Sequence, residues 1–168
     1  MNVKFMNPFV EAASEVLAAE VNVATTRGVL SLQKSALTSD DVTVLISLVG
    51  QVQGVVLYGL STATALALVS RMMGQDFSAF DSLAQSGVAE LGNVITGRAT
   101  IKLSESGFVS NISPPTLIHG KGVTISTLDF ARIVVPLTSE LGEIVVHLAI
   151  RDSIGDARGK LGATAPGS

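Results

Sequence analysis

The sequence predicts an α/β fold of the α+β type, in which a mostly antiparallel sheet is packed by about three helices. Three observations support this. Apolar residues recur at helical spacing in the first twenty residues and again between residues 61 and 104. The segments between and after them are rich in β-branched residues or alternate between apolar and polar side chains. Helices and strands are also grouped rather than alternating, which disfavours parallel βαβ units.

Length and composition predict one core-rich domain. The chain has 168 residues, of which 47% are hydrophobic and 15% are charged. This length suits a single domain, which we place at residues 1–151. From residue 152 onward large apolar residues are scarce and Gly, Ala and Ser are common, so residues 152–168 are predicted to form a flexible C-terminal tail.

The same composition excludes several classes of protein. The chain has no Cys and only two His, so a disulfide scaffold, a cysteine nucleophile and a Cys-ligated metal centre are ruled out, and we expect the chain to bind no metal or other cofactor. The net charge of −3 offers no large basic patch, which argues against nucleic-acid binding. No signal-peptide pattern opens the sequence, so a cytoplasmic location is expected.

Residues 42–70 carry no charge, which leaves a membrane span as an alternative. Gly50, Gln51, Gln53 and Gly54 interrupt the middle of this stretch, and the segments on either side are rich in β-branched residues. We therefore expect two buried strands joined by a turn, and no membrane insertion.

The remaining elements follow from local signals. The first helix carries Pro8 in its first turn, and residues 22–38 are predicted to form a loop and a strand. Ser61 is the expected N-cap of a second helix that ends at Gly74. Asp81 is the expected N-cap of a long third helix that reaches about Ser104. Strands are then expected near 108–112, 115–119, 122–126, 130–138 and 142–151.

The long helix carries the candidate site. Glu90 and Asn93 lie three residues apart, hence side by side, and the same outer strip carries the small residues Ser86 and Gly97. A carboxylate and an amide flanked by small residues would let a second protein approach closely. The alternative is an ordinary solvated helix face, because a Glu and an Asn at this spacing also arise by chance. The apolar stripe expected to face the core is Ala84, Val88, Leu91, Ile95, Ala99 and Leu103.

The string ELGNVITGRATIKL, Glu90 to Leu103, resembles the E-x-x-N, G-x-A, Leu signature of the CheC/CheX/FliY family of chemotaxis phosphatases, and most closely CheX. The likeness extends over about 150 residues and includes the predicted hairpin, the second helix and the segment ISPPTLIHGKG. The resemblance implies a CheC-like fold in which the long helix bears the motif.

The resemblance also implies a function in chemotaxis and two-component signalling. It predicts a hydrolase that dephosphorylates the aspartyl phosphate of a phosphorylated CheY-type response regulator. By this resemblance Asn93 and Glu90 are the catalytic residues: Asn93 orients the attacking water and Glu90 pairs with the regulator's lysine. Ser86 and Gly97 are candidate docking residues, and the Mg²⁺ is expected in the partner's active site.

Two further expectations follow. CheX-like proteins resemble homodimers joined through their sheets, so the resemblance implies that this chain is a homodimer. CheC carries two E-x-x-N sites, but the first helix here has Ser14 where a second Asn would stand, so a single site is expected, as in CheX. The alternative to a phosphatase is a non-catalytic dimeric adaptor for response regulators or flagellar-switch components. Among other residues, His147 is expected at a surface or interface. Arg71, Arg98 and Lys102 are expected to be isolated, solvated helix charges, and the alternative is that they help to steer an acidic regulator.

Overall fold

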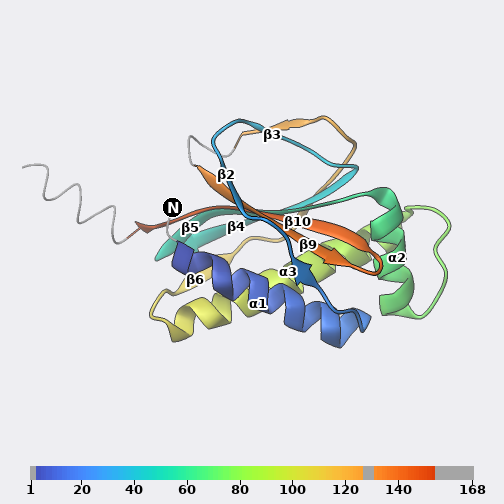
Figure 1. Cartoon of the computed structure of the whole chain (residues 1–168), viewed down its shortest axis with the longest axis horizontal. Coiled ribbons are helices and arrows are strands. Elements are labelled where there is room, and N and C mark those ends of the chain that lie inside the picture. Colours follow the sequence, from blue (N-terminus) through green and yellow to red (C-terminus); the bar gives the residue numbers. More distant parts are fainter. Residues whose placement is uncertain (1–2, 127–130, 154–168) are drawn as a thin grey trace, which may run out of the picture.

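Four long antiparallel strands form the centre of the sheet (Figure 1). The computed structural model describes residues 3–126 and 131–153. Strands β4 and β5 form one hairpin, β9 and β10 form another, and β5 pairs with β10 to join the two. Their bounds are Val42–Gly50, Val52–Leu60, Arg132–Ser139 and Gly142–Asp152.

Short strands extend this sheet on both sides. Strands β1 (Thr26–Arg27) and β2 (Ser31–Gln33) pair with β9. On the opposite side, β6 (Ser110–Ile112) and β7 (Thr116–His119) pair with β4. All of these pairings are antiparallel, as expected from the grouped elements.

Three α-helices occur among the described residues, and the elements around them agree with the expected caps. The first, α1 (Met6–Val16), follows a 3₁₀ turn (Val3–Phe5) and continues as a π-helical turn (Leu17–Val21). The second, α2 (Thr62–Met73), begins after Ser61, whose side chain accepts from the Thr64 N–H, and ends at Gly74 in a left-handed conformation. The third, α3, spans Ser82–Glu105.

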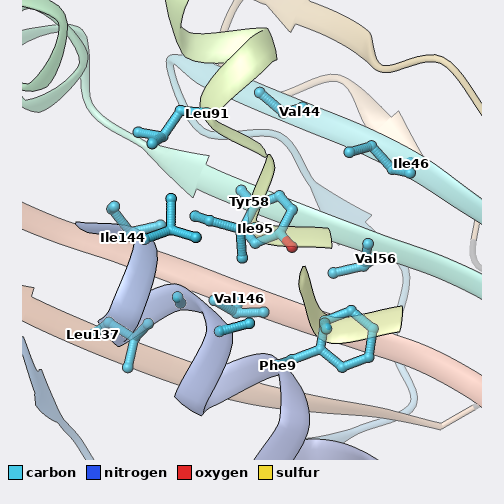
Figure 2. Packing of buried hydrophobic residues seen from close by; sticks show 14 of the residues in the cluster. Phe9, Val44, Ile46, Val56, Tyr58, Leu91, Ile95, Leu137, Ile144 and Val146 are labelled. Atoms are coloured by element: carbon cyan, nitrogen blue, oxygen red, sulfur yellow. The ribbon is translucent and has the colours of Figure 1, made fainter. Parts of the chain in front are cut away.

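Helices α1 and α3 cover one face of the sheet and form the main core with it (Figures 1 and 2). Phe9 of α1 and Ile95 of α3 meet strand residues such as Val56 and Val146, and all four are almost completely buried. No helix among the described residues has the length and apolar character needed to cross a bilayer. The charge-free segment instead forms the predicted hairpin β4–β5, which contributes core on the helix-facing side.

The opposite face of the sheet is also covered, which the sequence did not indicate. Strands β3 (Leu37–Thr38) and β8 (Thr124–Ile125) pair in a separate small sheet that arches over this face (Figure 1). Leu37 and Ile125 of this arch pack with Leu57 of β5 in a second apolar cluster.

The arch explains why the prediction for His147 was wrong. His147 lies opposite Leu57 in the pairing of β10 with β5, and only 7% of its surface is exposed. Burial, with the charge of Arg132 nearby, lowers the pKa of His147 to about 4. The alternating pattern of β10 predicted a strand with one face toward the core and one toward solvent. It could not show that β3 and β8, which are distant in the sequence, cover the face that carries His147.

Element boundaries differ from the expected ones at three places. The strands of the first hairpin run up to Gly50 and resume at Val52, so the turn is shorter than the interruption from Gly50 to Gly54 suggested. The expected strand within 22–38 is divided between β1, β2 and β3. Strand β10 reaches Asp152, one residue beyond the expected domain end, and the rest of the expected tail, residues 154–168, lies outside the described residues.

The buried His147 predicts a pH-dependent stability. An unfolded chain binds a proton on this imidazole near pH 6.5, whereas the folded chain does so only near pH 4. The free energy of unfolding should therefore fall as the pH is lowered from 6.5 to 4, with a contribution of up to about 1.4 kcal/mol per pH unit from this group.

The measurement is urea denaturation at several pH values for the wild type and for His147→Gln, which cannot titrate. The variant should lose stability less steeply over this range. Equal slopes for the two proteins would show that His147 titrates normally in the folded state.

Candidate functional site

Helix α3 carries every residue of the candidate site. Its first turn is fixed by Asp81, whose carboxylate accepts a hydrogen bond from the Ala84 N–H at 2.9 Å. The predicted apolar stripe is confirmed, because each of its members is at most 5% exposed. These are Ala84, Val88, Leu91, Ile95, Ala99 and Leu103.

Two glycines allow α3 to pack closely against its neighbours. A Cβ on Gly87 would lie 2.7 Å from the Met73 side chain of α2, and one on Gly92 would lie 3.0 Å from Val44 of β4. These contacts give an intramolecular reason for two of the three glycines in the helix. The third, Gly97, differs, since a Cβ there would have nothing within 4 Å.

A buried hydrogen bond also holds α3 to the sheet. The hydroxyl groups of Tyr58 on β5 and Thr96 on α3 lie 2.8 Å apart, and the Thr96 hydroxyl donates to the Gly92 carbonyl oxygen at 2.8 Å. Burial raises the pKa of Tyr58, which keeps the phenol protonated and able to donate. This pair was not predicted from the sequence, where its only signal is a polar residue, Thr96, on the core side of the helix.

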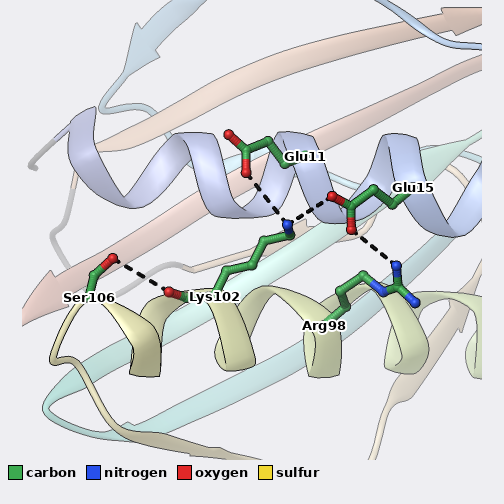
Figure 3. Close-up of polar contacts among 5 residues, drawn as sticks. All are labelled: Glu11, Glu15, Arg98, Lys102 and Ser106. Carbon is green, nitrogen blue, oxygen red and sulfur yellow. Dashed lines mark hydrogen bonds and ion pairs between the residues drawn. The ribbon is translucent and has the colours of Figure 1, made fainter.

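Ion pairs join the outer edges of α1 and α3 (Figure 3). The Glu15 carboxylate accepts from Lys102 at 2.8 Å and from Arg98 at 3.0 Å, and Glu11 lies 3.6 Å from Lys102. Hydrogen bonds from these two cations lower the pKa of Glu15, and the bond to Glu15 raises the pKa of Lys102. Arg98 keeps 47% of its side chain exposed, as expected for a solvated charge, but neither Arg98 nor Lys102 is an isolated charge, because both pair with Glu15.

The same holds for Arg71, which pairs with Glu140 in the turn between β9 and β10. All three cations considered in the sequence thus have carboxylate partners within this chain. Surface pairs of this kind contribute little to stability, but they restrict where the cations point.

The candidate residues share the side of α3 that faces away from the sheet. Ser86 and Glu90 are exposed, and Asn93 and Gly97 are partly exposed. Glu90 and Asn93 are three residues apart, a spacing that places their Cβ atoms about 5–6 Å apart. Neither side chain makes a hydrogen bond or an ion pair with any residue in the described part of the chain, so both are available to a partner.

This arrangement supplies two complementary groups. The carboxylate of Glu90 can accept from a cation, whereas the amide of Asn93 can both donate and accept hydrogen bonds, for example with a water molecule. Within residues 3–126 and 131–153, no three His, Cys, Asp or Glu side chains are grouped so that they could hold a metal ion.

Two exposed apolar residues of α3 were not recognised in the sequence. Leu83 and Ile101 are 50% and 61% exposed, and both fall on the outward side with Glu90. Helical spacing places them there, outside the apolar stripe that faces the core.

Comparisons with known proteins decide the family. The family model described as chemotaxis phosphatase CheX matches residues 42–138, more than half of the chain, and that range contains Glu90 and Asn93. The chain belongs to the CheX family. A curated relative, the CheY-P phosphatase CheX of Thermotoga maritima, is 26% identical over 153 residues, which cover 90% of this chain and 98% of the relative.

Solved structures show that the fold is that of the CheC-like superfamily. A CheC-like superfamily protein from Shewanella sp. PV-4 superposes with a TM-score of 0.82 at 30% identity, covering 90% of this chain and 99% of that one. The CheX-CheY-BeF3-Mg+2 complex from Borrelia burgdorferi includes a chain that superposes with a TM-score of 0.73 at 30% identity, covering 89% of this chain and 99% of that one. The α+β fold with three helices is thereby confirmed.

The contrast between Gly97 and Gly92 predicts opposite tolerance to a methyl group. Gly97→Ala should raise the free energy of unfolding by about 1 kcal/mol, because it removes the cost of a helical glycine without a new contact. Gly92→Ala gains the same propensity but presses a methyl group against Val44, so it should be less stable than Gly97→Ala by about 1–3 kcal/mol. Urea denaturation measures both, and equal effects would contradict the close seating of α3.

Proposed function

We propose that this CheX-family protein dephosphorylates the aspartyl phosphate of a CheY-type response regulator. Two relatives support this: the one from Thermotoga maritima is a CheY-P phosphatase, and the one from Borrelia burgdorferi is found in complex with CheY. The observation in this chain that carries the proposal is the outward pair Glu90 and Asn93, which has no partner among the described residues and lies on a helix held firmly to the sheet.

Asn93 is the residue proposed to act on water. Its amide would enter the regulator's active site and hold a water molecule in line with the phosphorus, with the carbonyl oxygen accepting from that water. Phosphoryl transfer needs little covalent help from the protein, so positioning a nucleophile is a sufficient contribution. No strong base is therefore required from this chain.

Glu90 is the residue proposed to fix the docking register. Its exposed carboxylate would pair with a lysine at the regulator's phosphorylation site. The Mg²⁺ that accompanies the aspartyl phosphate would belong to the regulator, so this chain would supply the amide and the carboxylate only.

Ser86 and Gly97 are proposed to let the regulator come close. Both lie on the strip that carries Glu90, and neither has a bulky side chain. The open space at Gly97 leaves room for a partner there. A side chain larger than a methyl group at this position would hold the regulator away from Asn93.

Substitution of the two proposed catalytic residues separates their roles. Asn93→Ala should lower kcat for dephosphorylation by at least about 100-fold, because the water is no longer positioned. Glu90→Gln should raise KM about tenfold through loss of a charge-assisted bond. The assay follows decay of a phosphorylated CheY-type receiver domain with each variant.

Two control variants match these changes. Asn111→Ala removes an exposed amide from β6, and Glu105→Gln removes an exposed carboxylate from the end of α3, and both should leave kcat and KM unchanged. An Asn93→Ala protein as active as the wild type would refute the mechanism. Binding of the regulator by the wild type without any acceleration would favour the adaptor function instead.

A homodimer is also proposed, joined through the edge of the sheet formed by β2. All three residues of β2 are exposed, Leu32 to 62%, although the strand pairs with β9 on its other side. An open edge with an exposed apolar side chain favours pairing with a second chain.

A charge placed on this edge should separate the dimer. Leu32→Lys is expected to convert a dimeric mass to a monomeric one in light scattering coupled to size-exclusion chromatography, because a lysine on an edge strand opposes pairing. A wild-type protein that is monomeric at high micromolar concentration would contradict the proposed dimer. A Leu32→Lys protein that stays dimeric would place the interface at another edge.

A further inference from the structure

Leu83 and Ile101 are placed symmetrically about the proposed catalytic pair. Leu83 precedes Glu90 by seven residues, and Ile101 follows Asn93 by eight, so each lies about two helical turns away. On the surface of α3, Leu83, Glu90 and Ile101 fall within about 20° of one another. Half or more of each apolar side chain is exposed to solvent.

We propose that Leu83 and Ile101 are the apolar anchors that hold the response regulator while Glu90 and Asn93 reach its phosphorylated aspartate. This proposal rests on the proposed function and extends it to binding specificity. The regulator would carry apolar side chains on both sides of its phosphorylation site, each able to cover one of these residues.

The outward strip of α3 from Leu83 to Ile101 has a length that suits such an interface. Leu83 and Ile101 are 18 residues apart, which corresponds to about 27 Å along the helix. A stable interface of ordinary size buries about 800 Å² on each partner, an area roughly 28 Å across. A regulator centred on Glu90 and Asn93 would therefore reach both anchors at the ends of its contact area.

The surroundings keep the strip open for a partner. Lys102 and Arg98 are drawn toward α1 by Glu15, so the cations next to Ile101 are already paired within this chain. Gly97 adds no side chain between Asn93 and Ile101. The polar groups in the middle set the register, and the apolar groups on either side restrict the partner to one with apolar side chains at matching positions.

A second copy of this chain is the rival occupant. A copy seated on Leu83 and Ile101 would also cover Glu90 and Asn93, which lie between them, and would block the proposed reaction. The proposed sheet-edge dimer leaves α3 free, because β2 lies at the edge of the sheet beside β9 and α3 contacts β4. The regulator is therefore the occupant that agrees with the rest of the structure.

The test uses Leu83→Ser, Ile101→Ser and the double variant. Val49→Ser is the matched control, because Val49 is 64% exposed on β4 and is not part of α3. Two quantities are measured with a CheY-type receiver domain encoded in the same genome: the kcat and KM for loss of its aspartyl phosphate, and the Kd for the same domain activated with beryllofluoride and Mg²⁺. Circular dichroism and light scattering check the fold and the oligomeric mass.

Each single variant should raise KM and Kd about tenfold while kcat changes by less than about twofold, and the double variant should raise them further. Val49→Ser should match the wild type. Unchanged KM and Kd in the folded double variant would overturn the proposal, and a loss of oligomeric mass in that variant would assign the strip to a second copy.

Failure of the proposed function gives a different pattern. If the wild type binds the activated receiver without accelerating loss of phosphate, the catalytic proposal falls, and the Kd values of the variants still decide the role of Leu83 and Ile101. If the wild type binds no receiver domain from its genome, both proposals fail.

Discussion

The close seating of α3 on strands β4 and β5 is the contact on which the site depends. Gly92 lets the helix approach Val44 and Tyr58, and the bond between Tyr58 and Thr96 fixes its rotation. Glu90 is two residues from Gly92, about 200° around the helix, so the contact that buries Gly92 turns Glu90 outward. A packing constraint inside the molecule thereby sets the direction of groups that would act outside it.

Helix α1 and the second face of the sheet complete the support. Glu11 and Glu15 of α1 hold Arg98 and Lys102 of α3, which joins the two helices along their outer edges as well as through the core. The arch formed by β3 and β8 covers the other face of the sheet. Because both faces of the sheet are covered, the sheet supports α3 rigidly and holds Glu90 and Asn93 in fixed positions. This suits a mechanism that depends on positioning.

Local signals predicted much of this structure. Ser61, Gly74 and Asp81 marked helix ends correctly because capping depends on neighbouring residues alone, and the β-branched run predicted the first hairpin. Contacts between distant segments could not be predicted in this way. The burial of His147 depends on the remote arch, and the pairing of Glu15 with Lys102 depends on how α1 lies beside α3. The outward position of Glu90 and Asn93 followed from helical periodicity, whereas the chemistry proposed for them came from the family resemblance.

The most direct measurement of the central claim is the rate at which an aspartyl phosphate is lost in the presence of the wild-type protein. Each CheY-type receiver domain of the same genome would be phosphorylated, freed of phosphodonor and followed with and without a catalytic amount of this chain. At least one receiver should lose its phosphate many times faster with the protein present, over several turnovers. Identical decay for every receiver, with and without the protein, would contradict the account.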